Sequence, residues 1–148
     1  MILEVKTFLE LTLEELYESL QLRSEIFVVE QNCVYQDTDG KDQKALHVLG
    51  KKDGNIIAYT RLFNANDYYK YASIGRVVIK KSERELGYGH DLISFSIKAI
   101  QEKFNKSTIK IGAQTYLKKF YESHKFNQIG EEYIEDGIPH IYMIRNLA

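Results

Sequence analysis

The sequence predicts one α/β domain, residues 1–148, built around a mixed β-sheet. Several short runs alternate apolar and polar residues, as strands with one buried face do. Other runs repeat their apolar residues at helical spacing. A strand at 73–79, a helix at 90–104 and a strand at 108–114 follow one another, and two parallel strands need a crossover of this kind. The sheet should therefore contain at least one parallel pair.

The first elements are a strand over 2–8 and a helix that begins at the capping box Thr12-x-x-Glu15. The helix carries apolar residues on one face, namely Leu13, Leu16, Tyr17 and Leu20. Apolar residues further on continue it, with a break, towards Glu30.

The remaining strands are separated by clear turn signals. A polar loop covers 32–44, and Asp53-Gly54-Asn55 is a hairpin turn. A second turn is expected at Asp136-Gly137. The strands are expected at 46–51, 56–63, 128–134 and 140–145, and a last short helix at 117–124.

The junction between strand 73–79 and helix 90–104 reads Arg84-Glu85-Leu86-Gly87-Tyr88-Gly89. Glycines let the main chain approach a ligand, and the first N–H groups of a helix attract anions, so this junction suits a phosphate. It is not a Rossmann fingerprint, because Leu92 stands where a third glycine is required, and no Gly-Lys-Ser/Thr follows as in a P-loop. An ordinary glycine-containing turn is the alternative.

A second motif lies about thirty residues further on, where Phe120-Tyr121-Glu122 precedes Phe126. Together with the Arg-x-x-Gly-x-Gly junction, it resembles the GNAT superfamily of acyl-CoA N-acyltransferases. The stretches 22–37 and 136–141 are similar to the ElaA-like branch of that superfamily. The resemblance covers nearly the whole chain and implies the GNAT fold, in which the fourth and fifth strands splay apart.

The resemblance implies acetyl-CoA as the cosubstrate. The main chain of Val77, Val78 and Ile79 would pair with the pantetheine arm, while also forming sheet core. Gln114 stands where many family members have asparagine. The pyrophosphate would be held by the main chain of Glu85, Leu86, Gly87, Tyr88, Gly89 and His90, with positive charge from Arg84.

Tyr121 stands where the family has its catalytic tyrosine, so we expect it to be the general acid; the alternative is that it only packs the last helix on the sheet. Several residues are candidates for the base that deprotonates the amine. His140 and Glu30 are the first candidates. Other candidates are Asp37 and His47, with Gln114 and Ser73 as holders of water.

The acidic run 37–42 lacks the first and twelfth carboxylates of an EF-hand, and we interpret it as a loop on the acceptor side that favours cationic amines. A non-glycine, Lys125, follows the tyrosine helix, where a left-handed residue would be needed.

Bulk properties fit a small enzyme. The net charge of -1 argues against nucleic acid or an anionic membrane as partner, and no run approaches membrane-spanning length. Cys33 is the only cysteine, so neither a disulfide framework nor a cysteine zinc site is expected, and no metal is. We expect a cytoplasmic N-acetyltransferase, and the resemblance leaves a homodimer open as its assembly. The alternatives are a non-catalytic acyl-CoA sensor and a protein-interaction domain of the same fold.

Overall fold

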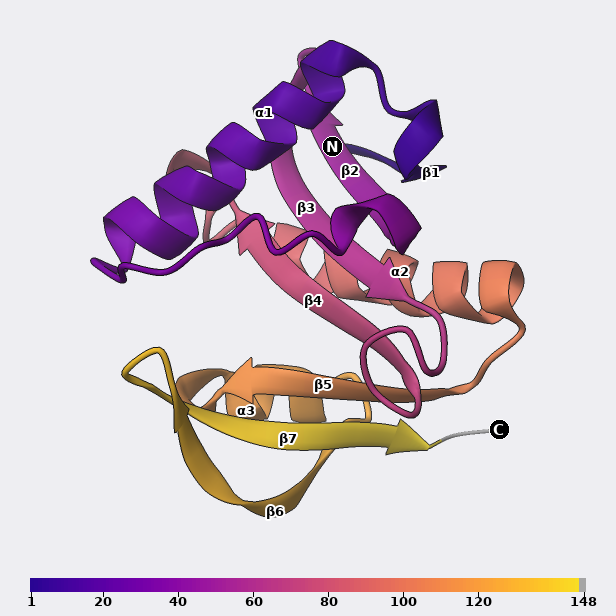
Figure 1. Ribbon diagram of the computed structural model, residues 1–148, viewed down its shortest axis with the longest axis vertical. Helices are drawn as coiled ribbons and strands as arrows, with labels where there is room; N and C mark the ends of the chain where they lie inside the picture. The colour runs from indigo at the N-terminus through magenta and orange to yellow at the C-terminus, as the bar shows by residue number, and fades with distance from the viewer. Residues whose placement is uncertain (147–148) are drawn as a thin grey trace.

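The computed structural model describes residues 1–146 as a seven-stranded mixed sheet in the order β1-β2-β3-β4-β5-β7-β6, confirming the predicted fold class (Figure 1). The strands are β1 (Ile2–Thr7), β2 (Leu46–Lys52), β3 (Asn55–Phe63), β4 (Ala72–Ile79), β5 (Thr108–Gln114), β6 (Asn127–Glu135) and β7 (Ile138–Asn146). Helix α1 (Leu13–Arg23) covers one face, and α2 (Tyr88–Phe104) and α3 (Lys118–Glu122) lie on the other. None of the helices within residues 1–146 is long and apolar enough to span a membrane.

Every predicted strand is present, with ends within two residues of the expected ones. The turns at Asp53-Gly54 and Asp136-Gly137 take positive φ at both positions, as tight hairpins require. Helix α2 begins two residues earlier than predicted, and a 3₁₀ turn at Thr115–Leu117 precedes α3. Lys125 adopts the left-handed conformation (φ 72°) that the sequence required of it.

Helix α1 opens with the predicted capping box, in which the Thr12 hydroxyl accepts from the Glu15 N–H at 3.0 Å. The prediction for its apolar face was wrong in one respect: Leu13 and Tyr17 are 87% and 75% exposed, and Leu22 is buried instead. Glu15 is also buried, and it can be because Lys6 of β1 and Lys51 of β2 pair with it. Burial opposes its ionisation, but these bonds outweigh that effect and lower the pKa of Glu15 to about 2.

The expected break in the first helix is a π-helical segment, Ser24–Glu30, which follows α1 directly. Such wide turns occur often at functional sites. This segment places Ile26 in the small core between α1 and the sheet, against Tyr59 and Val78. A larger core fills the space between the sheet and α2, where Leu92, Ile93 and other residues are fully buried. The sheet is thus covered on both faces.

Strands β4 and β5 form the only parallel pair among the described strands, and they are bonded at just two positions, Ala72 with Ile109 and Ser73 with Lys110. Beyond these pairs the strands separate towards their carboxyl ends (Figure 1). Arg76 breaks the regularity of β4 with a left-handed φ of 49°, and the pairing of β3 with β4 shifts register at that point. The splayed pair that the resemblance implied is therefore present.

Candidate active site

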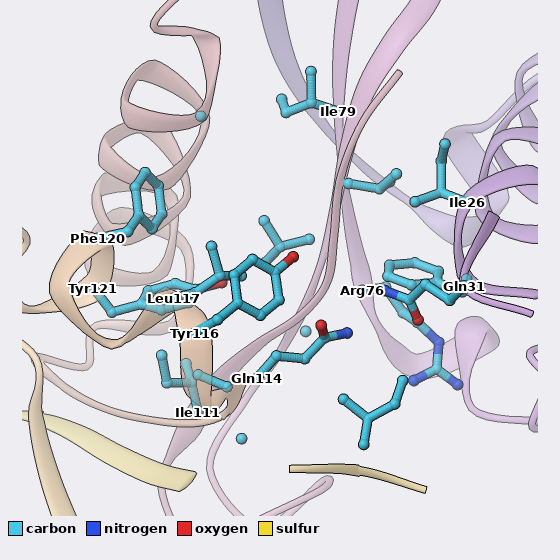
Figure 2. Close-up of a pocket in the computed structure, with 18 of the residues that line it drawn as sticks. Ile26, Gln31, Arg76, Ile79, Ile111, Gln114, Tyr116, Leu117, Phe120 and Tyr121 are labelled. Carbon is cyan, nitrogen blue, oxygen red and sulfur yellow. The ribbon is translucent and has the colours of Figure 1, made fainter. Parts of the chain in front are cut away.

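A cavity of about 590 Å³ lies where β4 and β5 diverge. Residues of β4 and the π-helical segment line one side, and residues of β5 and α3 line the other (Figure 2). Of the predicted site residues, the cavity brings together Glu30, Val77, Val78, Ile79, Arg84, Glu85, Gly87, Tyr88, Gly89, Gln114, Tyr121 and His140. These residues come from six separate segments that the fold brings to one place, and their roles stay predictions.

Two predicted residues, Leu86 and His90, do not line the cavity. The Leu86 side chain is 57% exposed at the tip of the turn. His90 packs against Phe120 of α3, and its Nδ1 lies 2.9 Å from Nε2 of His124 in the turn that follows α3. Only the main chain of these two residues is left to contact a ligand.

We call residues 84–90 the anion loop. Its main chain bends through left-handed conformations at Glu85 (φ 68°) and Gly87 (φ 80°). Gly87 is the N-cap of α2 and supplies no side-chain cap, so the first N–H groups of a 17-residue helix are left facing the cavity end. Glu85 is exposed. The loop can accept an anion through its main chain.

Arg84 joins the anion loop to the opposite wall. Its Nε donates to the Ile79 carbonyl at 3.2 Å, and its Nη2 donates to Oε2 of Glu30 at 2.8 Å. Both side chains are partly exposed. Glu30, one of the two predicted bases, therefore faces a guanidinium at the edge of the cavity.

Tyr121 lies in α3 and is 5% exposed. Its ring packs edge-on against Phe120, with centroids 5.1 Å apart, and against Phe126, at 5.9 Å. Burial raises the pKa of the Tyr121 hydroxyl, which keeps the phenol protonated at neutral pH. Tyr116 also lines the cavity; it is 77% exposed and was not singled out by the sequence. Its place directly after strand 108–114, two residues past Gln114, was the available signal.

His140 stands in β7, 9% exposed and stacked on Tyr133. Its Nδ1 lies 2.7 Å from the Ile138 carbonyl oxygen, which can only accept, so Nδ1 carries the hydrogen. Nε2 then keeps its lone pair, and it lies 3.6 Å from Oε2 of Glu135. A lone pair in this position can take a proton from a bound group.

The other candidate bases are engaged elsewhere. His47 is 1% exposed and outside the cavity, with Nδ1 2.6 Å from the Tyr59 hydroxyl and Nε2 2.9 Å from the Asp42 carbonyl. Burial lowers the pKa of His47. Asp37 is 8% exposed and accepts from Nε of Arg23 at 2.8 Å. Neither can serve an acceptor in the cavity.

The acidic run 37–42 does not present free carboxylates to an acceptor, contrary to the expectation from sequence. Its carboxylates form an arginine network, which consists of Arg23, Arg61 and Arg76 with Asp37, Asp39 and Asp42. Arg61 holds both oxygens of Asp39, at 2.8 and 2.9 Å. Burial opposes the ionisation of Asp39, but the guanidinium outweighs it and lowers the pKa of Asp39 to about 2. The partners come from α1, β3 and β4, which the loop's own sequence does not reveal.

Within residues 1–146, no group of three or more His, Cys, Asp or Glu side chains is arranged to hold a metal ion. What the cavity offers is an unpaired strand edge, main-chain donors at a helix N-terminus, a buried phenol and an imidazole with a free lone pair.

The model of the "Acetyltransferase (GNAT) domain" family matches residues 10–147. Protein ElaA of Escherichia coli (strain K12) is 40% identical over 140 residues, which is 93% of this chain and 92% of that protein. The crystal structure of E. coli ElaA superposes with a TM-score of 0.92 at 37% identity, covering 98% of this chain and 99% of that one. An acyl-CoA N-acyltransferase from Pseudomonas aeruginosa has a TM-score of 0.93 at 38% identity, with 99% and 100% coverage.

Proposed function

The chain belongs to the GNAT family of acetyltransferases and is ElaA-like, and from this premise we propose that it transfers an acetyl group from acetyl-CoA to a primary amine, directly within a ternary complex. One observation carries the proposal: the edge of β4 faces β5 across a cavity that ends at the N-terminus of α2. An extended amide chain pairs with an open strand edge, and a phosphate binds at a helix N-terminus. Pantetheine and pyrophosphate are joined in that order in coenzyme A.

In this arrangement the main chain of Val77, Val78 and Ile79 pairs with pantetheine. Gln114, across the cavity on β5, offers a side-chain amide to the same arm. The anion loop holds the pyrophosphate through its main-chain N–H groups, so the outward side chains of Leu86 and His90 do not hinder it. Arg84 adds positive charge.

The amine nitrogen attacks the thioester carbon, and a C–N bond forms as the carbonyl oxygen takes negative charge. A main-chain N–H on the β4 edge stabilises that oxygen. The C–S bond then breaks with its electron pair on sulfur, Tyr121 donates its proton to the thiolate, and the acetylated nitrogen releases its extra proton to water to give the neutral amide. Burial raises the pKa of this phenol, so it arrives protonated but is a weaker acid than a free phenol, and it gives up the proton only as negative charge develops on sulfur.

His140 is the base in this proposal. The Nδ1 bond to Ile138 leaves Nε2 free to take a proton from the acceptor ammonium before attack. Glu30 would first have to leave its ion pair with Arg84, so we assign it the task of holding that arginine. Solvent restores both proton carriers after each turnover.

Binding of acyl-CoA without turnover is the second candidate. The burial of Tyr121 between Phe120 and Phe126 favours it, because a tyrosine with this environment can serve packing alone.

Thermal unfolding with and without acetyl-CoA tests the first step. Ligand at 100 times its dissociation constant should add about 2.7 kcal/mol to the free energy of unfolding. Release of free thiol with a panel of primary amines, and the mass of the acetylated product, test the second. If acetyl-CoA stabilises the protein but no amine of the panel is acetylated, the acyl-CoA sensor is favoured. If acetyl-CoA at saturating concentration does not stabilise the protein, both candidate functions are excluded.

A further inference from the structure

A second, smaller hollow opens from the main cavity on the face of the sheet opposite α2. This tyrosine recess has a volume of about 70 Å³, and its lining includes Phe63, Tyr68, Tyr69, Gly112 and Glu135 together with the two arginines Arg61 and Arg76. Gly75, Gly112 and Glu135 line both hollows, so the two meet at the point where β4 and β5 separate.

The connection exists because two glycines follow the last bonded pair of the parallel strands. Ser73 pairs with Lys110, and two residues further along each strand stand Gly75 and Gly112. Neither has a side chain to close the space between the strands. The hydroxyls of Tyr133 and Tyr69 converge there, because a Cβ added to Gly112 would lie 2.9 and 3.1 Å from them.

The charges around the recess leave one carboxylate without a close partner of opposite charge. Arg61 and Arg76 are paired with aspartates of the arginine network. Lys110 lies on the rings of Tyr69 and Tyr142, 4.9 and 4.4 Å from their centroids. Glu135 is exposed, and its nearest basic group is the His140 imidazole at 3.6 Å. Glu135 lines the recess together with Tyr69. It stands two residues after Tyr133 in β6, so the two side chains lie on the same face of the sheet.

We infer that the recess binds the acceptor of the proposed transfer as an unbranched alkylammonium, with its nitrogen beside Gly112 and its N–H groups donating to Tyr69, Tyr133 and Glu135. An ammonium has three donors, and these residues supply three oxygen acceptors. A hollow of about 70 Å³ has room for the nitrogen and a slim methylene chain. A nitrogen on a branched carbon, as in a peptide N-terminus, is too wide. The inference rests on the proposed function and narrows its substrate class.

Proton movement follows from the same geometry. The bound ammonium lies beside Glu135, whose carboxylate is 3.6 Å from Nε2 of His140. One N–H proton passes to Nε2, and the neutral amine keeps the electron pair with which it attacks through the gap between Gly75 and Gly112. Glu135 remains ionised and faces the imidazolium that forms.

The first arm of the test compares acceptors by thiol release at saturating acetyl-CoA. We expect n-butylamine to exceed sec-butylamine in kcat/KM by about tenfold or more, the effect of one misplaced carbon in a tight site. Nα-acetyl-lysine amide separates the two sources of an alkylammonium: turnover above that of n-butylamine indicates a lysine side chain, and turnover below it indicates a free amine. Equal or better use of sec-butylamine would overturn the inference.

The second arm needs no turnover. In ¹⁵N-labelled protein saturated with coenzyme A, n-butylammonium should shift the amide signal of Gly112. Tyr69→Phe and Glu135→Gln should weaken that binding about tenfold to a hundredfold, as expected for lost bonds to a charged group. Gly112→Ala places a methyl group 2.9 and 3.1 Å from the Tyr133 and Tyr69 hydroxyls, which must shift and would then no longer converge on the ammonium, and the φ of Gly112 is not left-handed, so the strand is retained. Tyr71→Phe, outside both hollows, is the matched control and should bind as the parent does.

The outcomes separate the two proposals. If coenzyme A binds but the amine leaves Gly112 unmoved, or the three variants bind it like the control, the recess is not the acceptor site and the proposed function stands. If coenzyme A itself does not bind, the proposed function fails and the inference falls with it.

Discussion

The arginine network and the anion loop are both polar segments rich in turn residues, yet they are built in opposite ways. In the network, each carboxylate lies within 3.0 Å of a guanidinium, and Arg23 and Arg61 are 1% exposed. In the anion loop, Gly87 caps α2 without a side chain, and the main-chain donors face a cavity. A segment whose charges are paired internally maintains the fold, whereas one that leaves donors open is where a ligand is expected. The predictions below test that distinction.

The largest effect is expected in the open region. Tyr121→Phe removes the hydroxyl that would protonate the leaving thiolate, and turnover should fall by about 10²- to 10⁴-fold. Affinity for acetyl-CoA, measured by calorimetry, should stay unchanged because the ring still packs on Phe120. Tyr116→Phe is the control in the same cavity. Parent-like turnover in the Tyr121 variant, with chemistry rate-limiting, would leave this tyrosine a packing role only.

The network should respond first through stability, although Arg61 and Arg76 also line the tyrosine recess. Arg61→Ala strips Asp39 of its two-point partner inside the protein, and removing one partner of a buried pair costs about 3 to 5 kcal/mol. Urea unfolding measures the loss. Arg84→Ala breaks a partly exposed pair and should cost about 1 kcal/mol or less. If Arg61→Ala is insoluble, Arg61→Lys should still be measurably less stable than Arg84→Ala. If Arg61→Ala and Arg84→Ala lowered the free energy of unfolding equally, the proposed difference between the two regions would be wrong.

The anion loop should respond through binding alone. Gly89→Asp sets a carboxylate at the first turn of α2, where it repels a pyrophosphate but is compatible with the helix. The roughly 2.7 kcal/mol of stabilisation expected from acetyl-CoA at 100 times its dissociation constant should vanish. Gly89→Ala is the control, because its Cβ would meet Phe120 at an ordinary 3.4 Å. Retained binding in the Asp variant would place the anion elsewhere.

The smallest effect is expected in the stability of the folded protein at acidic pH. The pKa of Asp39 and that of Glu15 are both lowered to about 2 in the folded protein. The folded state therefore binds fewer protons than the unfolded state, in which carboxyls titrate near pH 4. Their contribution to stability is complete above about pH 4 and is lost as the pH falls towards 2. Asp39→Asn should flatten the stability curve in this range, and the exposed Glu14→Gln should not. If the free energy of unfolding of Asp39→Asn and of the parent fell equally below pH 4, Asp39 would not be paired as the structure has it.

The sequence predicted what depends on local pattern. Alternation located the strands, the Asp-Gly pairs located the hairpins, and the motif around Gly87 and Tyr121 located both walls of the cavity. These signals lie within a few residues of what they specify.

Features that depend on distant partners were missed. Glu15 is buried because Lys6 and Lys51 reach it, 9 and 36 residues away. Asp39 is neutralised by Arg61, 22 residues away. Tyr69 and Tyr133 meet at Gly112 only because the sheet brings three segments together. No window of sequence contains such pairs, so a buried charge looks like a surface one until the fold is known.

Only two bonded pairs of residues join β4 to β5, so the sheet consists of two parts with a short connection between them. Beyond these two pairs, the main-chain groups of β4 and β5 that face each other are not hydrogen-bonded across the gap. Their amide hydrogens should therefore exchange quickly with deuterated solvent. A ligand bound between β4 and β5 would protect these amides and slow their exchange in both strands at once. Deuterium uptake by the amides of β4 and β5 would thus show whether the cavity is occupied.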